Sequence, residues 1–336
     1  MKKYILPVLA SFLIVTFGYA VNLNGTPQEL RELIVESLGG ISNTTDLEPL
    51  TDDLTDGTQK SQIVGSTGNV AAVDTDGHLQ VHNMNDGLSI AMGEVTGVTF
   101  IHKFGNAPDF DTGDLAVTIW DGADDGDINQ MMYVYSSSTD IDTIVSSSAS
   151  DTGEVEIQGL DGNYDIATQT ATLFGQTSVS LDTPLFRVFR VKNIGSVDLV
   201  GKVYTYATSS ITSGVPDDPR KVRAVTDDGN NQTEMAIYTI PAGTTGYMRS
   251  FFAATAGANK NSNYVIKLRA RPLGGVFQLK HRTALADLGT SHFQHPYIEP
   301  EIFLEKTDIE MTVQVLASGV TAASVSAGFD IVLVDN

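Results

Sequence analysis

Apolar and polar residues alternate along most of the chain. In residues 264–271 apolar side chains occupy every second position, and the basic Lys267, Arg269 and Arg271 lie between them. A period of two places all the apolar side chains on one face of an extended strand. Residues 311–315 repeat the pattern, so both segments are predicted to be half-buried strands of antiparallel sheets, with the basic side chains more exposed. The residues predicted to face the core are Tyr264, Ile266, Leu268, Met311, Val313, Phe329, Ile331 and Leu333.

Turn signals separate these predicted strands, and no long helical period lies between them. Asp-Gly pairs begin at residues 76, 86, 161 and 228, and such pairs favour tight hairpin turns. The chain has 31 Gly and 11 Pro, and only 18% of its residues are charged, which is typical of β proteins. We expect an all-β fold with two antiparallel β-sandwich or jelly-roll-like domains, preceded by a hydrophobic N-terminal segment and one short amphipathic helix.

A polar stretch with two prolines, Thr208 to Pro219, is the predicted internal boundary. It separates an expected acidic β-sandwich domain, residues 67–207, from a jelly-roll-like domain, residues 216–336. Residues 104–186 contain 15 acidic side chains and no Lys or Arg, whereas the rest of the chain to its end is nearly neutral. Copies of so acidic a lobe repel one another unless cations or a basic partner intervene.

The first 20 residues are hydrophobic after a basic start. Two lysines follow Met1, and an apolar run then ends at Gly18-Tyr19-Ala20, whose small residues fit a secretory cleavage site. The run is barely long enough to span a membrane. Residues 1–20 are therefore predicted to be either a signal peptide cleaved after Ala20 or a retained hydrophobic anchor, and only the anchor would contact a membrane.

Residues 21–66 are predicted to form one short helix followed by an acidic linker. Thr26 to Glu29 is a capping box with Pro27 at the first helical position. Because so short a helix is marginal alone in water, its apolar stripe needs a surface. That surface is expected to belong either to a partner chain or to the chain's own β domain. The stripe consists of Leu30, Leu33, Ile34 and Leu38.

The overall charge narrows the classes of partner. The chain has 41 acidic and 20 basic residues, a net charge of −21, so it is not expected to bind nucleic acid. It has no cysteine, which excludes disulfides and thiolate chemistry.

Two Asp-rich loops are candidates for calcium binding. Alternating Asp side chains on a Gly-bearing loop supply the oxygen ligands that Ca²⁺ prefers. Neither loop fits the EF-hand pattern, and solvated turns are the alternative interpretation. No other cofactor is expected. The candidate calcium ligands are Asp109, Asp111, Asp114, Asp121, Asp124 and Asp127.

No catalytic constellation stands out. His292 and His295 resemble a metal pair, but residues three apart on a strand point to opposite faces, which argues against zinc. No Gly-x-Ser-x-Gly elbow is present, and the single tryptophan, Trp120, offers little stacking surface for a sugar. A secreted hydrolase or carbohydrate-binding module is therefore the least favoured function, and we expect no enzyme activity.

Several short segments resemble a family of poorly characterised virion proteins of marine tailed bacteriophages, over roughly residues 96–336. The segments that carry this resemblance are His102 to Asn106, Gly159 to Asp161, Asn230 to Thr233, Ile240 to Gly243, Gly246-Tyr247, Phe277 to His281, Glu305 to Ile309, Ser326 to Asp330 and Val334 to Asn336.

This resemblance implies a β-rich structural protein of the virion, such as a capsid decoration, head fibre or tail-associated protein. A homo-oligomer with other virion proteins as partners is then expected. The alternative is an exported cell-surface or extracellular filament or sheath subunit, released by cleavage after Ala20. A secretory signal would be out of place in a particle that assembles in the cytoplasm, so the N-terminus decides between the two locations.

Overall fold

The computed structural model describes residues 87–110, 116–123, 128–256, 262–287, 290–316 and 323–336. These residues form an all-β structure with several antiparallel sheets, which confirms the predicted fold class. The described part holds one short α-helix, α4 (Gly87–Ala91), and one 3₁₀ turn, η2 (Pro219–Lys221). The predicted N-terminal segment and amphipathic helix lie outside the described residues.

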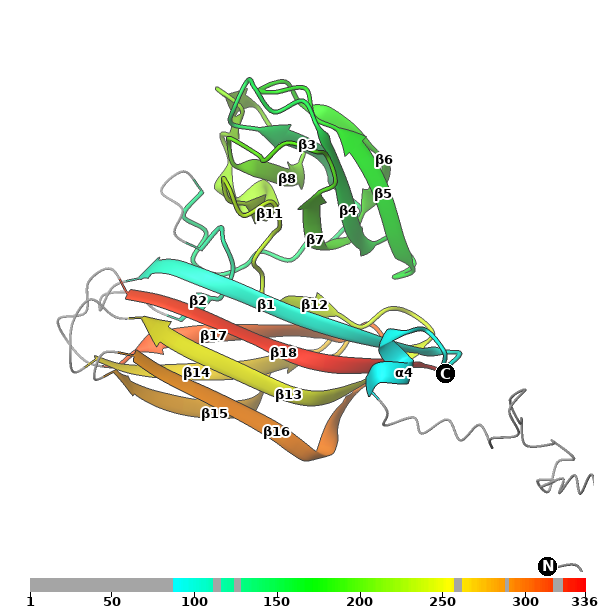
Figure 1. The fold of residues 1–336 in the computed structure, drawn as a ribbon, viewed down its shortest axis with the longest axis vertical. Helices are drawn as coiled ribbons and strands as arrows, with labels where there is room; N and C mark the ends of the chain where they lie inside the picture. The colour runs from blue at the N-terminus through cyan, green and yellow to red at the C-terminus, as the bar shows by residue number, and fades with distance from the viewer. Residues whose placement is uncertain (1–86, 111–115, 124–127, 257–261, 288–289, 317–322) are drawn as a thin grey trace, which may run out of the picture. The chain divides into compact units, whose positions relative to one another are not determined.

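A β-sandwich of two antiparallel sheets contains the C-terminal strands (Figure 1). The strands of the first sheet, in spatial order, are β1 (Val98–Phe110), β18 (Ala323–Asp335), β13 (Thr244–Ala256) and β16 (Thr290–Phe303). Those of the second sheet are β12 (Ile237–Thr239), β17 (Asp308–Val315), β14 (Ser262–Arg271) and β15 (Gln278–Asp287), with the short β2 (Val117–Thr118) also paired to β17.

The inner faces of these two sheets form the core that the alternation predicts. All eight residues predicted to face the core are at most 3% exposed. The basic side chains between them, Lys267, Arg269 and Arg271, are half-buried and thus more exposed than their apolar neighbours, as predicted. Period-two patterning therefore identified both the strands and their inner faces correctly.

An insertion lobe, residues 141–226, leaves this sandwich after β2 and returns before β12. One of its sheets contains β11 (Val222–Thr226), β8 (Val203–Ala207), β3 (Ile141–Ser146) and β6 (Val179–Leu185). The other contains β5 (Ile166–Thr172), β4 (Glu154–Leu160) and β7 (Arg187–Asn193), and a small hairpin pairs β9 (Ile211–Thr212) with β10 (Val215–Pro216).

Strand pairing divides the chain at other places than the expected boundary. β1 and β2 fall inside the predicted domain 67–207, but they pair with β18 and β17 of the C-terminal sandwich. β11 lies beyond the predicted boundary, yet it pairs with β8 of the insertion lobe. The stretch Thr208 to Pro219 is thus a hairpin within the lobe, and its Ser, Thr, Gly and Pro content suits a tight turn as well as a linker.

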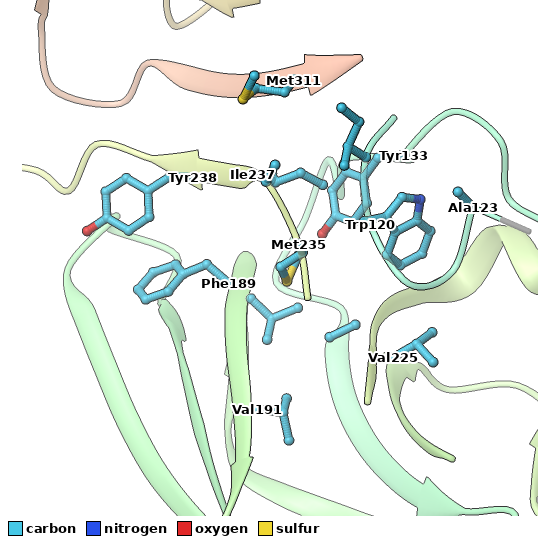
Figure 2. Packing of buried hydrophobic residues seen from close by; sticks show 14 of the residues in the cluster. Trp120, Ala123, Tyr133, Phe189, Val191, Val225, Met235, Ile237, Tyr238 and Met311 are labelled. Carbon is cyan, nitrogen blue, oxygen red and sulfur yellow. The ribbon is translucent and has the colours of Figure 1, made fainter. Parts of the chain in front are cut away.

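One hydrophobic cluster connects the insertion lobe with the sandwich (Figure 2). Phe189 of β7 packs against Tyr238 of β12, with ring centres 4.9 Å apart. Trp120 is fully buried against the edge of Tyr133, at 5.1 Å between ring centres. Since the cluster is continuous, the lobe is fixed to the sandwich by packing as well as by polar contacts.

Candidate functional site: the outer faces of the β-sandwich

The outer face of the first sheet carries aromatic and aliphatic side chains where a solvated sheet normally carries polar ones. A cross-strand row joins Phe100 on β1, Val332 on β18, Tyr247 on β13 and Ile302 on β16. A parallel row places Phe104 and Phe252 on either side of a glycine on β18. We call this surface the open face, and its members are Phe100, His102, Phe104, Tyr247, Phe252 and Ile302.

Gly328 lets the two phenylalanines of the open face approach each other. A Cβ at this position would lie 2.5 Å from the Phe252 ring, so no larger residue fits beneath it. The His102 ring stacks on Phe252 at 5.7 Å and lies 5.8 Å from Phe104. The result is a flat aromatic surface in the middle of the sheet.

The described residues cover the open face at one end only. Ile90 of α4 packs there against Val98 and Val332. In the same cross-strand row as the covered Val332, Phe100 is 42% exposed and Ile302 is 56% exposed. Full burial of an exposed side chain of this size stabilises a contact by about 1.5–3 kcal/mol, so burying the part of Phe100 or Ile302 that is still exposed would contribute roughly half of that.

A polar trio interrupts the open face. Asp330 accepts hydrogen bonds from Nδ1 of His102 at 2.6 Å and from the Ser250 hydroxyl at 2.5 Å. In a serine hydrolase the hydroxyl must instead donate to the imidazole, which then takes its proton. Because the carboxylate stands between the other two groups, this arrangement satisfies polar groups on the sheet and gives no activated nucleophile.

The outer face of the second sheet is charged and largely covered. We call its ionic residues, Arg187, Arg269, Arg271, Asp308 and Glu310, the charged face. Asp308 binds the insertion lobe through Arg187, with Nε at 2.9 Å and Nη2 at 3.1 Å. Both residues are at most 5% exposed, and this two-point geometry makes the pair strong and directional.

Further donors complete the charged face. Arg271, directly opposite Asp308 in the register, donates to it at 2.5 Å, and the Thr239 hydroxyl donates at 2.7 Å. Arg269 likewise lies opposite Glu310 and bonds to it.

The charged face changes the protonation of its members. Burial raises the pKa of Glu310, although Arg269 and the Tyr135 hydroxyl lower it in part. Burial lowers the pKa of Arg187 but hydrogen bonds with Asp308 raise it, and the net shift is upward. Arg187 therefore stays charged at every physiological pH and must keep its anionic partner.

Aromatic rings cover the charged face from outside. The Arg187 guanidinium lies 4.2 Å from the centre of the Phe186 ring, and Arg271 lies 4.7 Å from both Tyr135 and Phe277. These cation–π contacts exclude water from the ion pairs. The charged face thus joins the insertion lobe to the sandwich through an ion pair.

The structure places only part of the predicted calcium site. Asp121 is 1% exposed, and its Oδ2 accepts the Glu234 backbone N–H at 2.7 Å, while Oδ1 has no partner. Burial raises the pKa of Asp121 well above its usual value. The remaining predicted ligands lie outside the residues whose side chains are described. Within the described residues no group of three or more His, Asp or Glu side chains is arranged to hold a metal.

The histidines follow the strand geometry expected of β16. His292 is exposed, whereas His295 points inward and pairs with His281 of β15, at 4.6 Å between ring centres. The two residues that are three apart in sequence therefore do face opposite sides.

Two features escaped the sequence analysis. Arg187 and Asp308 are 121 residues apart, and nothing local marks them as partners. Phe100, Phe104 and Phe252 alternate with inward residues like any half-buried strand, and only the structure shows that they face outward.

The predicted assembly residues Leu30, Leu33, Ile34 and Leu38 lie outside the described residues. None of the described helices is long and apolar enough to span a membrane.

Comparisons with known proteins give no family. No family model and no curated protein sequence matches the chain. Among solved structures, infectious bursal disease virus of the Gx strain is similar at 10% identity and a TM-score of 0.19, over 75% of this chain and 82% of the viral one. A subviral particle of the same virus's VP2 gives 8% identity and a TM-score of 0.16, over 74% and 77%. A Bacillus thuringiensis Cry1Da tryptic core gives 8% and 0.16, over 58% and 51%. TM-scores this low do not define a shared fold.

Proposed function

We propose that this protein is a non-enzymatic structural subunit of a multi-copy assembly and that its copies meet through the open face. The observation that carries this proposal is the pair of exposed residues Phe100 and Ile302 at opposite edges of one continuous apolar row. A sheet face of this kind buries itself by packing against a second sheet, as in the interior of a sandwich.

A second copy is the partner that the charges favour. Each chain carries a net charge of −21, so copies can approach closely only through a surface without net negative charge. The rows from Phe100 to Phe104 contain one carboxylate, that of Asp330, which already accepts hydrogen bonds from His102 and Ser250. Two open faces therefore meet without bringing unpaired acidic groups together.

The edge of the first sheet is unsuited to assembly by strand addition. β16 is its outer strand, and Pro296 and Pro300 within it lack backbone N–H donors. Between them the chain bulges, so that only Arg249 of β13 lies opposite residues 297–300. Prolines and bulges block pairing with another strand along β16, so assembly through this edge is disfavoured relative to the open face; β1 forms the opposite edge of the sheet.

The resemblance in sequence supports a proposal for the kind of particle. We propose a virion component of a tailed bacteriophage, with a capsid decoration, head fibre or tail-associated position as the options. The hydrophobic start of the chain supports the second candidate, an exported filament or sheath subunit. Mass analysis of the native N-terminus separates them: an intact Met1 in DNA-filled particles supports the virion, and a chain that starts at Val21 supports export.

Self-association of matched variants tests the open face. Phe100→Glu and Ile302→Glu place a charge on it, and sedimentation velocity should show at least tenfold weaker association than for the wild type. Val197→Glu is the control, because Val197 is 76% exposed in the loop after β7 of the insertion lobe. A wild type that stays monomeric at every concentration, or open-face variants that associate like the control, would overturn the proposal.

Deleting residues 1–40 tests the contribution of the N-terminal segment. If the predicted helix is the connector between neighbours, the truncated chain stays folded but no longer assembles. If the open face makes the contact alone, the truncated chain still forms the native oligomer. Because the charge variants and the truncation remove different segments, their results identify which surface connects the copies.

A further inference from the structure

The two sheets of the sandwich meet along an edge where no backbone hydrogen bonds join them. β15 ends the second sheet and β16 ends the first, and these two strands are not paired with each other. Side chains alone connect them. Lys280 of β15 forms an ion pair with Glu301 of β16 at 3.0 Å, and His281 lies against His295. An additional link at this edge would therefore join the two sheets through side chains.

We propose that His281 and His295 form a two-imidazole site for a transition-metal ion of the Zn²⁺, Ni²⁺ and Cu²⁺ class, which joins the edge strands of the two sheets. Imidazole nitrogen is a preferred ligand of all three ions, whereas Ca²⁺ and Mg²⁺ prefer oxygen. The site is distinct from the open face and does not depend on the proposed assembly.

The separation of the two rings suits one shared ion. With metal–nitrogen bonds of about 2.0–2.1 Å, two imidazoles on one ion place their ring centres roughly 4.5 Å apart at a right angle and roughly 5.2 Å apart at the tetrahedral angle. The observed separation is 4.6 Å, and the ring planes are tilted by 42°.

One further oxygen atom lies close to the two histidines. The Tyr297 ring lies 4.8 Å from His295, and its buried hydroxyl has no hydrogen-bond partner among the described residues. Both histidines are only half-buried, so water can complete the coordination.

An aromatic wall fixes the two histidines on the inner side. Phe251 of β13 lies 4.6 Å from His281 and 5.7 Å from His295, and Phe293 stacks on His295 at 6.2 Å with an interplanar angle of 3°. Rings held in this way lose little conformational freedom when they bind an ion, and prepositioned ligands favour binding.

Metal titration of tag-free full-length protein tests this site. The background carries His78→Gln and His82→Gln, because these histidines could bind metal independently. Thermal melting with ZnSO₄, NiCl₂ or CuSO₄ should raise the midpoint, and MgCl₂ at the same ionic strength should not. His281→Gln and His295→Gln should each lower the affinity for Ni²⁺ at least tenfold, while His292→Gln, an exposed histidine on the same strand, should leave it unchanged.

Spectroscopy makes the result independent of how the variants fold. The Cu²⁺-loaded parent should show two equatorial imidazole nitrogens by electron paramagnetic resonance. Affinity should fall as the pH drops below the usual imidazole range, because protons compete for the same nitrogens. Fewer than two imidazole nitrogens, no binding by the parent protein, or equal loss of affinity in His292→Gln would each overturn the proposal.

Discussion

The two outer faces of the sandwich reverse the usual arrangement of a half-buried sheet. On the second sheet the outward residues are charged, yet Asp308 and Glu310 are at most 4% exposed because the insertion lobe and aromatic rings cover them. On the first sheet the outward residues are aromatic or aliphatic, yet Phe100 and Ile302 stay exposed. The chemical type of an outward-facing residue therefore does not predict its burial, because burial depends on whether another segment covers that residue.

The difference also explains what each face does. Charges that leave water need partners, and every carboxylate of the charged face has an arginine opposite it in the strand register. Apolar groups that stay in water need no partner within the chain, but burying them against another apolar surface is favourable. The charged face thus stabilises the fold, whereas the open face is the surface that we propose for association.

The largest expected effect comes from breaking the ion pair between Arg187 and Asp308 on the charged face. Asp308→Ala leaves the Arg187 guanidinium buried without its anion, and breaking such a pair costs about 3–5 kcal/mol of unfolding free energy. Denaturant unfolding followed by circular dichroism measures this loss. A loss below about 1 kcal/mol would show that water or another group replaces the carboxylate, since that is the range of exposed ion pairs.

A double replacement is the control for this loss. Arg187→Met together with Asp308→Leu removes both charges and keeps apolar volume at the site. Replacing a buried ion pair by apolar groups is often neutral, so the double variant should regain part of the stability that Asp308→Ala loses, although Arg271 and the Thr239 hydroxyl still lack their acceptor. If both proteins are equally destabilised, packing at this site matters more than the unpaired charge.

Asp121 gives a smaller effect that depends on pH. Its pKa is raised in the folded state, so from about pH 4 upward the folded protein binds more protons than the unfolded chain. Stability should therefore fall as the pH rises towards the raised pKa. Asp121→Asn cannot ionise, and its unfolding free energy should lose this pH-dependent decline, as unfolding curves between pH 4 and 9 would show.

The same replacement tests the predicted calcium site. If the Asp-rich loops bind Ca²⁺ through Asp121, the wild type melts at a higher temperature with Ca²⁺ than with chelator at matched ionic strength, and Asp121→Asn loses the difference. Equal midpoints for the wild type would instead favour the solvated-turn interpretation.

The smallest expected effect is on the polar trio of the open face. Ser250→Ala removes one hydrogen bond to Asp330, whose side chain is 23% exposed and accessible to water, so the loss should be about 1 kcal/mol. Thermal melting measures it. Asp330→Asn is the matched variant, because it keeps the shape but weakens the bond to His102. A stability loss well above that of an ordinary hydrogen bond would mean that the trio contributes more to the stability of the sheet than this one hydrogen bond accounts for.

The sequence predicted strands better than it predicted their partners. Alternation identified the core faces of β14, β17 and β18, because the pleat alone determines which side chains share a face. It did not predict that β1 pairs with β18, since this contact joins Val98 to Val334 and no local signal records it. Lys103 and Gly105 also point inward from β1, so the inward positions of this strand are not uniformly apolar and its alternation is harder to recognise.

The candidate site was less predictable for the same reason. Charged residues at alternate positions, such as Arg269 and Arg271, look solvated until a covering segment is known. The histidine geometry could be predicted in part, because residues three apart on a strand diverge. The partner of His295 could not, since His281 belongs to the other sheet.

The most direct test of the account uses the absence of native cysteine. A single Ile302→Cys on the open face and, separately, Val197→Cys on the insertion lobe each provide one thiol for maleimide labelling. The account predicts that assembly slows labelling at residue 302 at least tenfold relative to the dilute monomer and leaves residue 197 unchanged. Equal labelling rates at residue 302 in monomer and assembly would contradict the claim that copies meet through the open face.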